Sequence, residues 1–292
     1  MLNGNFMKRF LIGLVLLLCI SFYIVSTQKR SLIVTTTTSL YATGLLDELK
    51  ERFESENPSV MVKFIATGTG EALKRASQGG VDLVLVHAPS LEKQYMEKGV
   101  IERNGSIFAY NYFILVGPPD DPAEASGKSV IDAFKSIYSA GERGRALFIS
   151  RGDNSGTNVR EMQIWNMAGL NPKNRSWYIE SGSDMVTTLS IANEKQAYTL
   201  VDVGTWLFMK DKLKLKAIVD RGDELINIYS VYIVPSGNTR DASAFKQFLL
   251  SREGQEIINN FRGGGLFFSA IWPNDSTSWL RSVWEKWSEI KG

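Results

Sequence analysis

The sequence is poor in the residues that support covalent and metal chemistry. Its 292 residues include a single cysteine, Cys19, and a single histidine, His87. Because Cys19 lies near the N-terminus in an apolar segment, the rest of the chain has no thiol for a disulfide, a zinc site or a nucleophile. A hydrolase would need Ser155 with His87 as its base, and Asn-Ser-Gly is not the G-x-S-x-G elbow. We therefore expect no enzyme, no metal and no cofactor, with a hydrolase as the minor alternative.

The chain also lacks an excess of charge. The formal net charge is +2, and Lys8 and Arg9 in the N-terminal segment account for it, so the remainder is neutral. The protein therefore has no net charge that would attract nucleic acid or a membrane surface. If this protein binds an anion, the affinity must come from local geometry.

One long apolar run is present, at the N-terminus. Phe10–Val25 is uncharged and lies between the basic pair and a polar stretch at 26–30. This layout predicts a secretory leader over residues 1–30, hence a periplasmic protein or one on the outer face of the cytoplasmic membrane. A retained membrane anchor is the alternative, although the run reaches only roughly 24 Å of a ~30 Å hydrocarbon core. Lipidation at Cys19 is a further alternative, which the large Leu18 before it disfavours.

Beyond the leader, strand-length apolar runs alternate with helical patterns. Leu32–Thr36, Val60–Ala66 and Val81–Val86 have strand character, and Leu45–Ser55 and Glu71–Ser77 have helical spacing. The alternation continues to about residue 201. This pattern predicts an α/β fold in which mostly parallel sheets are covered by helices.

Two β-rich segments are longer than the alternating units. We interpret Phe108–Gly117 and Ile226–Val234 as crossover strands that form a hinge between two lobes. Lobe 1 then comprises 31–111 plus 229–292, and lobe 2 comprises 112–228. A ligand is expected in the cleft between them, at the carboxyl ends of strands from both lobes.

The C-terminal stretch from Ser278 has apolar residues at helical spacing, namely Leu280, Val283, Trp284 and Trp287. It predicts an amphipathic helix packed on its own lobe, with docking on a partner protein as the alternative. We expect a monomer.

Four polar segments each follow a predicted strand and precede a predicted helix. We name them turn 1 (Thr35–Ser39), turn 2 (Thr67–Gly70), turn 3 (Ser150–Thr157) and turn 4 (Glu180–Met185). Such a turn places hydroxyl groups beside the unpaired N–H groups of a helix start, which together form a site for anions. Helix capping explains one turn of this kind. Four of them, two in each lobe, favour a shared binding site.

The residues of these turns suit an oxyanion better than a nucleotide. Gly68 and Gly70 allow close approach of the backbone, but Leu73 stands where a dinucleotide fingerprint needs a third glycine. Arg151 can donate two parallel hydrogen bonds, and Asp153 is expected to pair with it or to cap the helix. A buried tetrahedral dianion needs a donor for each acceptor site, and N–H and O–H dipoles supply them without a net positive charge.

These segments resemble the tungstate-binding proteins that serve ATP-driven importers, a branch of the periplasmic binding-protein superfamily. The similarity runs from about Ser31 to about Phe268. Its most specific pieces are Thr35–Ser39 with Gly44–Asp47, Thr67–Leu73, Asp82–Ala88, Ser150–Thr157, and Ala192–Leu200 with Gly204 and Thr205. The resemblance implies the type II fold, in which two lobes close on a hinge, and an ABC permease and ATPase as partners.

The resemblance also implies a ligand, tungstate, with molybdate or another tetrahedral oxyanion as the alternative, and a set of residues that hold it. Carried onto this sequence, the set is Thr38, Ser39, Gly68, Thr69, Arg151, Ser155, Gly156, Thr157 and Ser183. Two departures are the apolar stretch Leu40–Ala42 after turn 1 and Asp184 in turn 4, which we place outside the site because it would repel a dianion. His87 is either a cleft-facing donor or a structural residue at a strand end. A membrane-tethered oxyanion sensor is the second functional alternative.

Overall fold

The structure is a computed structural model that describes residues 29–290. Most of the predicted leader, with Cys19, lies outside the described residues. Within residues 29–290, none of the helices combines the length and apolar character that crossing a membrane requires. The same residues contain no group of three or more His, Cys, Asp or Glu side chains placed to hold a metal ion.

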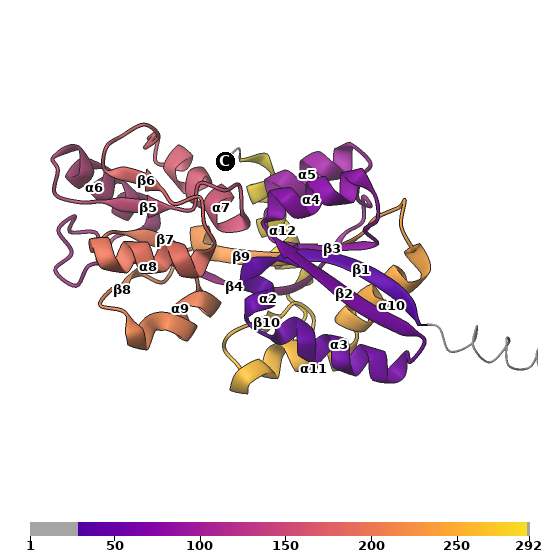
Figure 1. The fold of residues 1–292 in the computed structure, drawn as a ribbon. Coiled ribbons are helices and arrows are strands. Elements are labelled where there is room, and N and C mark those ends of the chain that lie inside the picture. Colours follow the sequence, from indigo (N-terminus) through magenta and orange to yellow (C-terminus); the bar gives the residue numbers. More distant parts are fainter. Residues whose placement is uncertain (1–28, 291–292) are drawn as a thin grey trace, which may run out of the picture.

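The sheet of lobe 1 has three parallel strands and three antiparallel ones, in the order β10-β4-β9-β3-β1-β2 (Figure 1). The parallel strands are β1 (Arg30–Thr37), β2 (Val60–Thr67) and β3 (Leu83–Val86). The antiparallel strands are β4 (Ser106–Gly117), β9 (Ile226–Ile233) and β10 (Phe268–Ser269). Helices cover both faces of this sheet. Their bounds are α3 (Leu45–Glu56), α10 (Thr239–Leu250) and α11 (Arg252–Asn260) on one face, and α4 (Thr69–Gln78) and α5 (Pro89–Glu97) on the other.

The two faces of lobe 1 are filled by alternate residues of the same strands. Leu83 and Leu85 of β3 belong to the apolar core under α3 and α10, whereas Val84 and Val86 belong to the core under α4 and α5. This division follows from the strand period of two, which sends successive side chains to opposite faces. A strand buried on both faces is therefore apolar at every position.

Lobe 2 is built on a second group of strands. In it β5 (Phe148–Ser150) pairs in parallel with β6 (Tyr178–Glu180), and β7 (Thr199–Asp202) and β8 (Lys216–Val219) pair antiparallel with β4. Its helices are α6 (Val130–Glu142), α7 (Gly156–Met167), α8 (Met185–Lys195) and α9 (Val203–Met209), followed by two short 3-10 turns, η1 (Lys210–Lys212) and η2 (Asp223–Leu225). A cluster of aromatic rings around Trp165 fills its core.

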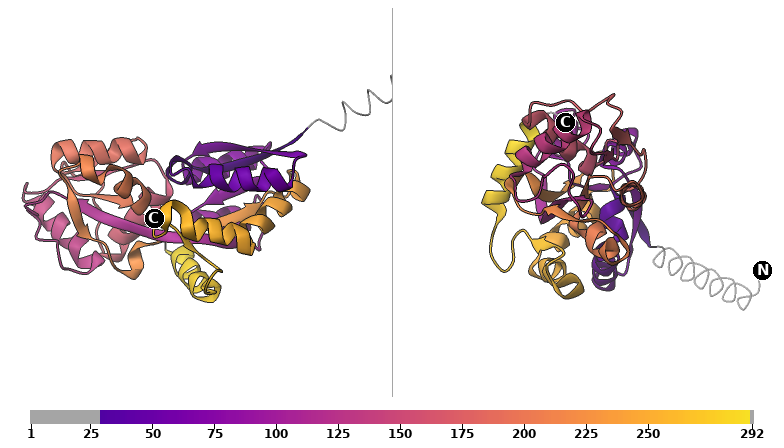
Figure 2. Two further views of the ribbon diagram at one scale, coloured as in Figure 1. Left: turned by 90° about the horizontal axis from the view of Figure 1, so that it is seen from below. Right: turned by 90° about the vertical axis from the view of Figure 1, so that its left-hand side faces the viewer.

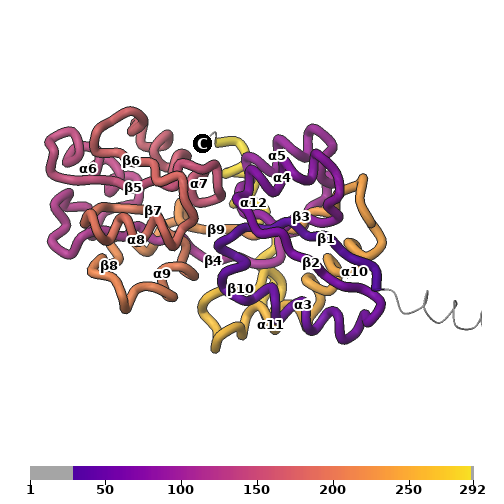
Figure 3. Tube along the Cα trace, viewed as in Figure 1, coloured from indigo at the N-terminus to yellow at the C-terminus, as the bar shows by residue number. Residues whose placement is uncertain are grey.

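Two long strands connect the lobes. β4 contributes residues to both groups of strands, and β9 returns the chain to lobe 1 (Figures 2 and 3). The α/β fold with flanking helices is confirmed, and the antiparallel pairs come from these crossovers. The proposed lobe boundaries, 111/112 and 228/229, fall inside β4 and β9. Separate apolar cores lie on the two sides of them, which supports that proposal.

The C-terminal segment forms the predicted amphipathic helix, α12 (Thr277–Glu289). Its apolar face is buried through Leu280, Trp284 and Trp287. The helix packs on α5, and Leu280 and Trp284 share an apolar cluster with Ile107 of β4 and Ile228 of β9. It therefore lies against the crossover strands, at the junction of the lobes (Figure 2).

Candidate functional site

Turn 1 differs locally from the prediction. The predicted helix over Leu45–Ser55 is present as α3, with Gly44 as its cap, but an additional short helix, α2 (Thr38–Ala42), follows β1 at once. Its cap is Thr37, whose Oγ1 accepts a hydrogen bond from the Leu40 amide at 3.4 Å. Thr38 and Ser39 are therefore first-turn helical residues, where amides have no intrahelical partner.

Turns 1 and 2 lie side by side because β1 and β2 are parallel and in register, with Thr37 opposite Thr67. Turn 2 leads into α4, which begins at Thr69 and not at the predicted Glu71. Gly68 is the cap, in extended conformation and without a side chain. Thr69 is fully buried. The predicted residues of these two turns are thus neighbours at one end of the lobe 1 sheet.

Turn 3 is organised around Asp153. Its carboxylate accepts from Arg151 Nη2 at 2.6 Å, which confirms the predicted pairing, and from the amide of Ser155 at 3.1 Å. Ser155 caps α7, since its Oγ accepts from the Asn158 amide at 3.3 Å. The Ser155 amide is consequently occupied. The hydroxyl proton of Ser155 and the first amides of α7, at Gly156 and Thr157, remain as donors.

Turn 4 is joined to turn 3 through backbone hydrogen bonds. The Ser181 amide donates to the Ser150 carbonyl at 2.8 Å, and the Gly182 amide donates to the Arg151 carbonyl at 2.9 Å. The Ser183 hydroxyl donates to the Ser181 carbonyl at 3.2 Å, within its own turn. Asp184 caps α8 and is exposed. Turn 4 therefore supports turn 3, and Ser183 is the predicted residue with the least freedom to contact a ligand.

Turns 2 and 3 meet across the cleft between the lobes. The Gly70 amide lies 3.4 Å from the Asn154 carbonyl, to which it donates. A Cβ placed on Gly68 would lie 3.8 Å from Ser155 Cα, and one placed on Gly156 would lie 2.5 Å from His87 Cε1. Glycine at position 156 is therefore what allows lobe 2 to approach His87.

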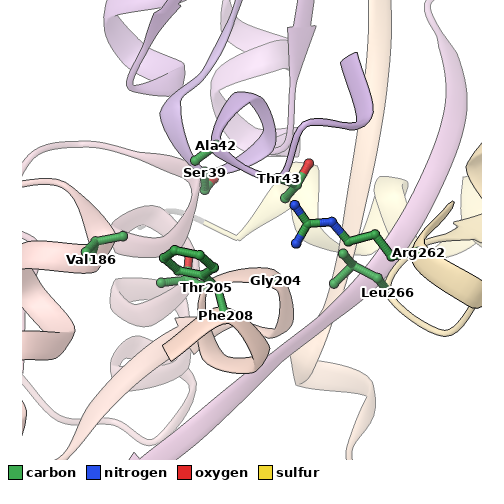
Figure 4. Close-up of a pocket in the computed structure, with 9 residues that line it drawn as sticks. All are labelled: Ser39, Ala42, Thr43, Val186, Gly204, Thr205, Phe208, Arg262 and Leu266. Atoms are coloured by element: carbon green, nitrogen blue, oxygen red, sulfur yellow. The ribbon is translucent and has the colours of Figure 1, made fainter. Parts of the chain in front are cut away.

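Turn 1 faces α8 and α9 across a pocket that is open to solvent (Figure 4). Lobe 1 contributes Ser39, Ala42, Thr43, Arg262 and Leu266, and lobe 2 contributes Val186, Gly204, Thr205 and Phe208. The Arg262 guanidinium points toward Thr43. An adjoining pocket is lined by Thr38 and Ser39 of turn 1 and by residues 184–187 at the end of turn 4 and the start of α8. The four turns thus surround the cleft: turns 1 and 2, 2 and 3, and 3 and 4 are neighbours, and turns 4 and 1 line the same pocket.

Several buried polar atoms in this ring have no hydrogen-bond partner among the described residues. They are Thr36 Oγ1 in turn 1, Thr69 Oγ1 in turn 2, and Arg151 Nε and Thr157 Oγ1 in turn 3. Arg151 is only 4% exposed. A buried donor left unpaired costs about 1–3 kcal/mol, so four in one region are unusual in a native protein. An oxyanion in the cleft would accept hydrogen bonds from them.

His87 belongs to a buried network at the hinge. Its Nδ1 is 2.8 Å from Asn227 Oδ1, and its ring stacks on Tyr229 with centroids 5.0 Å apart. Burial lowers the pKa of His87 to about 4. The imidazole is therefore neutral near pH 7, and Arg151 supplies the positive charge of the site.

Sequence reasoning missed Asp202 as a residue of this region. Asp202 is buried, caps α9, and accepts from both the amide and the hydroxyl of Thr205, at 2.9 and 2.8 Å. Burial raises the pKa of Asp202. The signal was present, because Asp202 follows a predicted strand and precedes a hydroxyl residue three positions later, as helix caps do.

Comparison with known proteins places this geometry among binding proteins of importers. A profile described as a PBP superfamily domain matches residues 25–253. A protein of Haloferax volcanii named as an ABC transporter anion-binding protein is 44% identical, over 83% of this chain and 72% of its own length. The tungstate-binding protein TupA of Peptoclostridium acidaminophilum is 36% identical, over 80% of this chain and 82% of its own length.

Solved structures agree with these sequence relatives. The tungstate-binding protein TupA from Desulfovibrio alaskensis G20 superimposes with a TM-score of 0.70 at 34% identity, covering 82% of this chain and 98% of that chain. The tungstate ABC transporter structure from Geobacter sulfurreducens gives 0.69 at 38% identity, covering 80% and 99%.

Proposed function

This chain belongs to the periplasmic binding-protein superfamily and to the tungstate-binding proteins within it, and on that premise we propose that it captures tungstate between its lobes outside the cytoplasm and delivers it to an ABC importer. The residues proposed to hold the ion are those of turns 1, 2 and 3, with Arg151 as the charged donor. The permease and ATPase of the importer are its proposed partners.

The observation that carries this proposal is the set of unpartnered buried donors around the cleft, from Thr36 and Thr69 in lobe 1 and from Arg151 and Thr157 in lobe 2. Tungstate is a tetrahedral dianion whose oxygens accept several hydrogen bonds each. Donors that approach from two lobes can surround such an ion and replace its hydration shell. Because each lobe holds only part of the donor set, tight binding requires both lobes to close on the ion.

The site attracts anions through one positive charge, and this charge alone does not determine which anion binds. One guanidinium, oriented by Asp153, provides charge-assisted hydrogen bonds, and neutral hydroxyl and amide dipoles provide the rest. Discrimination then depends on the size of the cage and the number of donors. Sulfate and phosphate are smaller, and phosphate can carry a proton that needs an acceptor.

A calorimetric titration of residues 29–292 against tungstate, molybdate, sulfate and phosphate tests this proposal. We expect one site that binds tungstate about a hundredfold more tightly than sulfate or phosphate, the factor that follows from losing one or two charge-assisted hydrogen bonds. Absence of binding, or equal affinity for sulfate, would refute it. Tungstate and molybdate share shape and charge, so their ratio of affinities is the finer readout.

A further inference from the structure

The helix α12 lies beyond the stretch that the superfamily profile matches, which ends at residue 253. It packs on α5, where Trp284 Nε1 donates to Glu92 and Lys93 pairs with Glu289, and on the crossover strands, so it is held by lobe 1 and the hinge. Its last turn contacts α7 of lobe 2. One helix therefore joins the two lobes outside the cleft, in the same structure in which turns 2 and 3 are in contact.

The first contact with lobe 2 is made by Gln163, which is 1% exposed. Its Nε2 donates to the Ile290 carbonyl at 2.6 Å and to the Trp287 carbonyl at 3.0 Å, and it lies 3.4 Å from Ser90 Oγ. The last carbonyls of a helix have no intrahelical partner. A side chain from lobe 2 thus satisfies the end of a helix that packs on lobe 1.

The second contact is made by Arg160, which is 3% exposed. The centre of its guanidinium lies 3.6 Å from the centroid of the Trp287 ring, and Nη1 donates to the carbonyls of Glu224 and Ile226, at 2.9 Å each. Among residues 29–290, no carboxylate lies within ion-pair distance of Arg160. The Trp287 face and the two carbonyls therefore compensate this buried cation, and of these groups only Trp287 belongs to α12.

Both contacts are made by the helix that begins at turn 3. Because α7 is a single uninterrupted helix, Gln163 and Arg160 move with Ser155–Thr157. Rotation of lobe 2 away from turn 2 would draw Gln163 and Arg160 away from Trp287.

We propose that α12 is a clamp across the lobes, and that Gln163 and Arg160 are positioning residues that favour the closed form and so set how long the oxyanion is held. This inference rests on the proposed function. Neither residue needs to touch the ion, because a contact made only in the closed form shifts the equilibrium towards it. Such a contact acts mainly on the dissociation rate.

The clamp can first be tested without any ligand. In a Cys19→Ser background no native cysteine remains, so Ser77→Cys in lobe 1 and Glu194→Cys in lobe 2, both exposed, provide unique spin-label sites. Pulsed electron resonance on the ligand-free protein should show a longer and broader distance distribution in Gln163→Met than in the parent. Glu285→Ala, on the exposed face of α12, is the control and should match the parent. Identical distributions for the parent and Gln163→Met would overturn the clamp, whatever the ligand is.

The second measurement is stopped-flow dissociation of tungstate. We expect roughly tenfold faster dissociation of tungstate in Gln163→Met, with an unchanged association rate. Trp287→Leu, which removes the ring beneath Arg160, should act in the same direction and serves if Gln163→Met does not fold. A lower melting temperature with unchanged dissociation would mean that the contact persists in the open form, and the clamp would be wrong. Failure of the parent to bind tungstate would refute the proposed function, while the label distances would still decide the clamp.

Discussion

Arg151 offers the sharpest test of the site. Its guanidinium is 4% exposed, one nitrogen pairs with Asp153 at 2.6 Å, and Nε has no partner among the described residues. Asp153 thus holds the guanidinium in place and leaves the other nitrogens available. If these donate two charge-assisted hydrogen bonds to tungstate, at about 1.5–3 kcal/mol each, Arg151→Ala should cost about 3–6 kcal/mol of binding free energy.

That loss corresponds to an affinity lower by about a hundredfold to ten-thousandfold. Arg151→Lys keeps the charge and loses the planar fork, so it should fall between the parent and Arg151→Ala. Arg145→Ala removes the same charge from the exposed surface of lobe 2 and should bind like the parent. Calorimetry measures all four proteins.

Stability should change much less than affinity. Without ligand, Arg151 makes an ion pair with Asp153, whose side chain is 22% exposed and also accepts from the Ser155 amide, so the carboxylate keeps a donor and access to water when Arg151 is removed. The melting temperature of ligand-free Arg151→Ala should therefore stay within a few degrees of the parent. Unchanged affinity would remove Arg151 from the site, and equal losses in affinity and stability would assign it a structural role.

Three further predictions follow from the cleft and the hinge. Gly156→Ala should weaken tungstate binding at least tenfold, because its Cβ would lie 2.5 Å from His87 Cε1. Gly68→Ala is the control, since its Cβ meets only ordinary contacts at 3.8 Å. Calorimetry compares the two variants, and equal losses of affinity would contradict the steric argument. Burial lowers the pKa of His87 from 6.5 to about 4. The folded protein therefore keeps its full stability above pH 6.5, and the free energy of unfolding falls by about 3 kcal/mol as the pH falls from 6.5 towards 4. The difference in free energy of unfolding between the parent and His87→Asn should therefore become smaller as the pH falls. A difference that stays constant with pH would refute the lowered pKa of His87. Arg262 lines the pocket at the cleft and has no carboxylate within ion-pair distance among the described residues, so its charge is free to attract an anion. Arg262→Ala should therefore slow tungstate association at low salt and leave the dissociation rate unchanged, and stopped flow measures both rates.

Local patterns in the sequence predicted the fold, and they identified the turns that the structure brings together. Period-two burial along β3 and the glycine and hydroxyl residues after β2 are consequences of short-range chemistry, so they can be read from neighbouring residues. The short helix α2 escaped prediction because β-propensity and helix capping compete in a run of threonines, and the Thr37 cap decided in favour of a helix directly after β1.

Features that depend on how the lobes are placed could not be predicted. The contact of Gly156 with His87 joins residues of two lobes, and nothing in either local sequence specifies it. Helical spacing likewise predicted that Trp287 is buried but not that Arg160 covers its ring. These contacts follow from a hinge geometry that β4 and β9 set over the whole molecule.

Crystals of residues 29–292 grown with tungstate would test the central claim most directly, because tungsten gives a strong anomalous signal at its L edges. We predict one dominant anomalous peak in the cleft, with oxygens of the ion within hydrogen-bond distance of Thr69 Oγ1, Thr157 Oγ1 and the Arg151 guanidinium. A dominant peak that contacts only one lobe, or one remote from Arg151, would contradict the account.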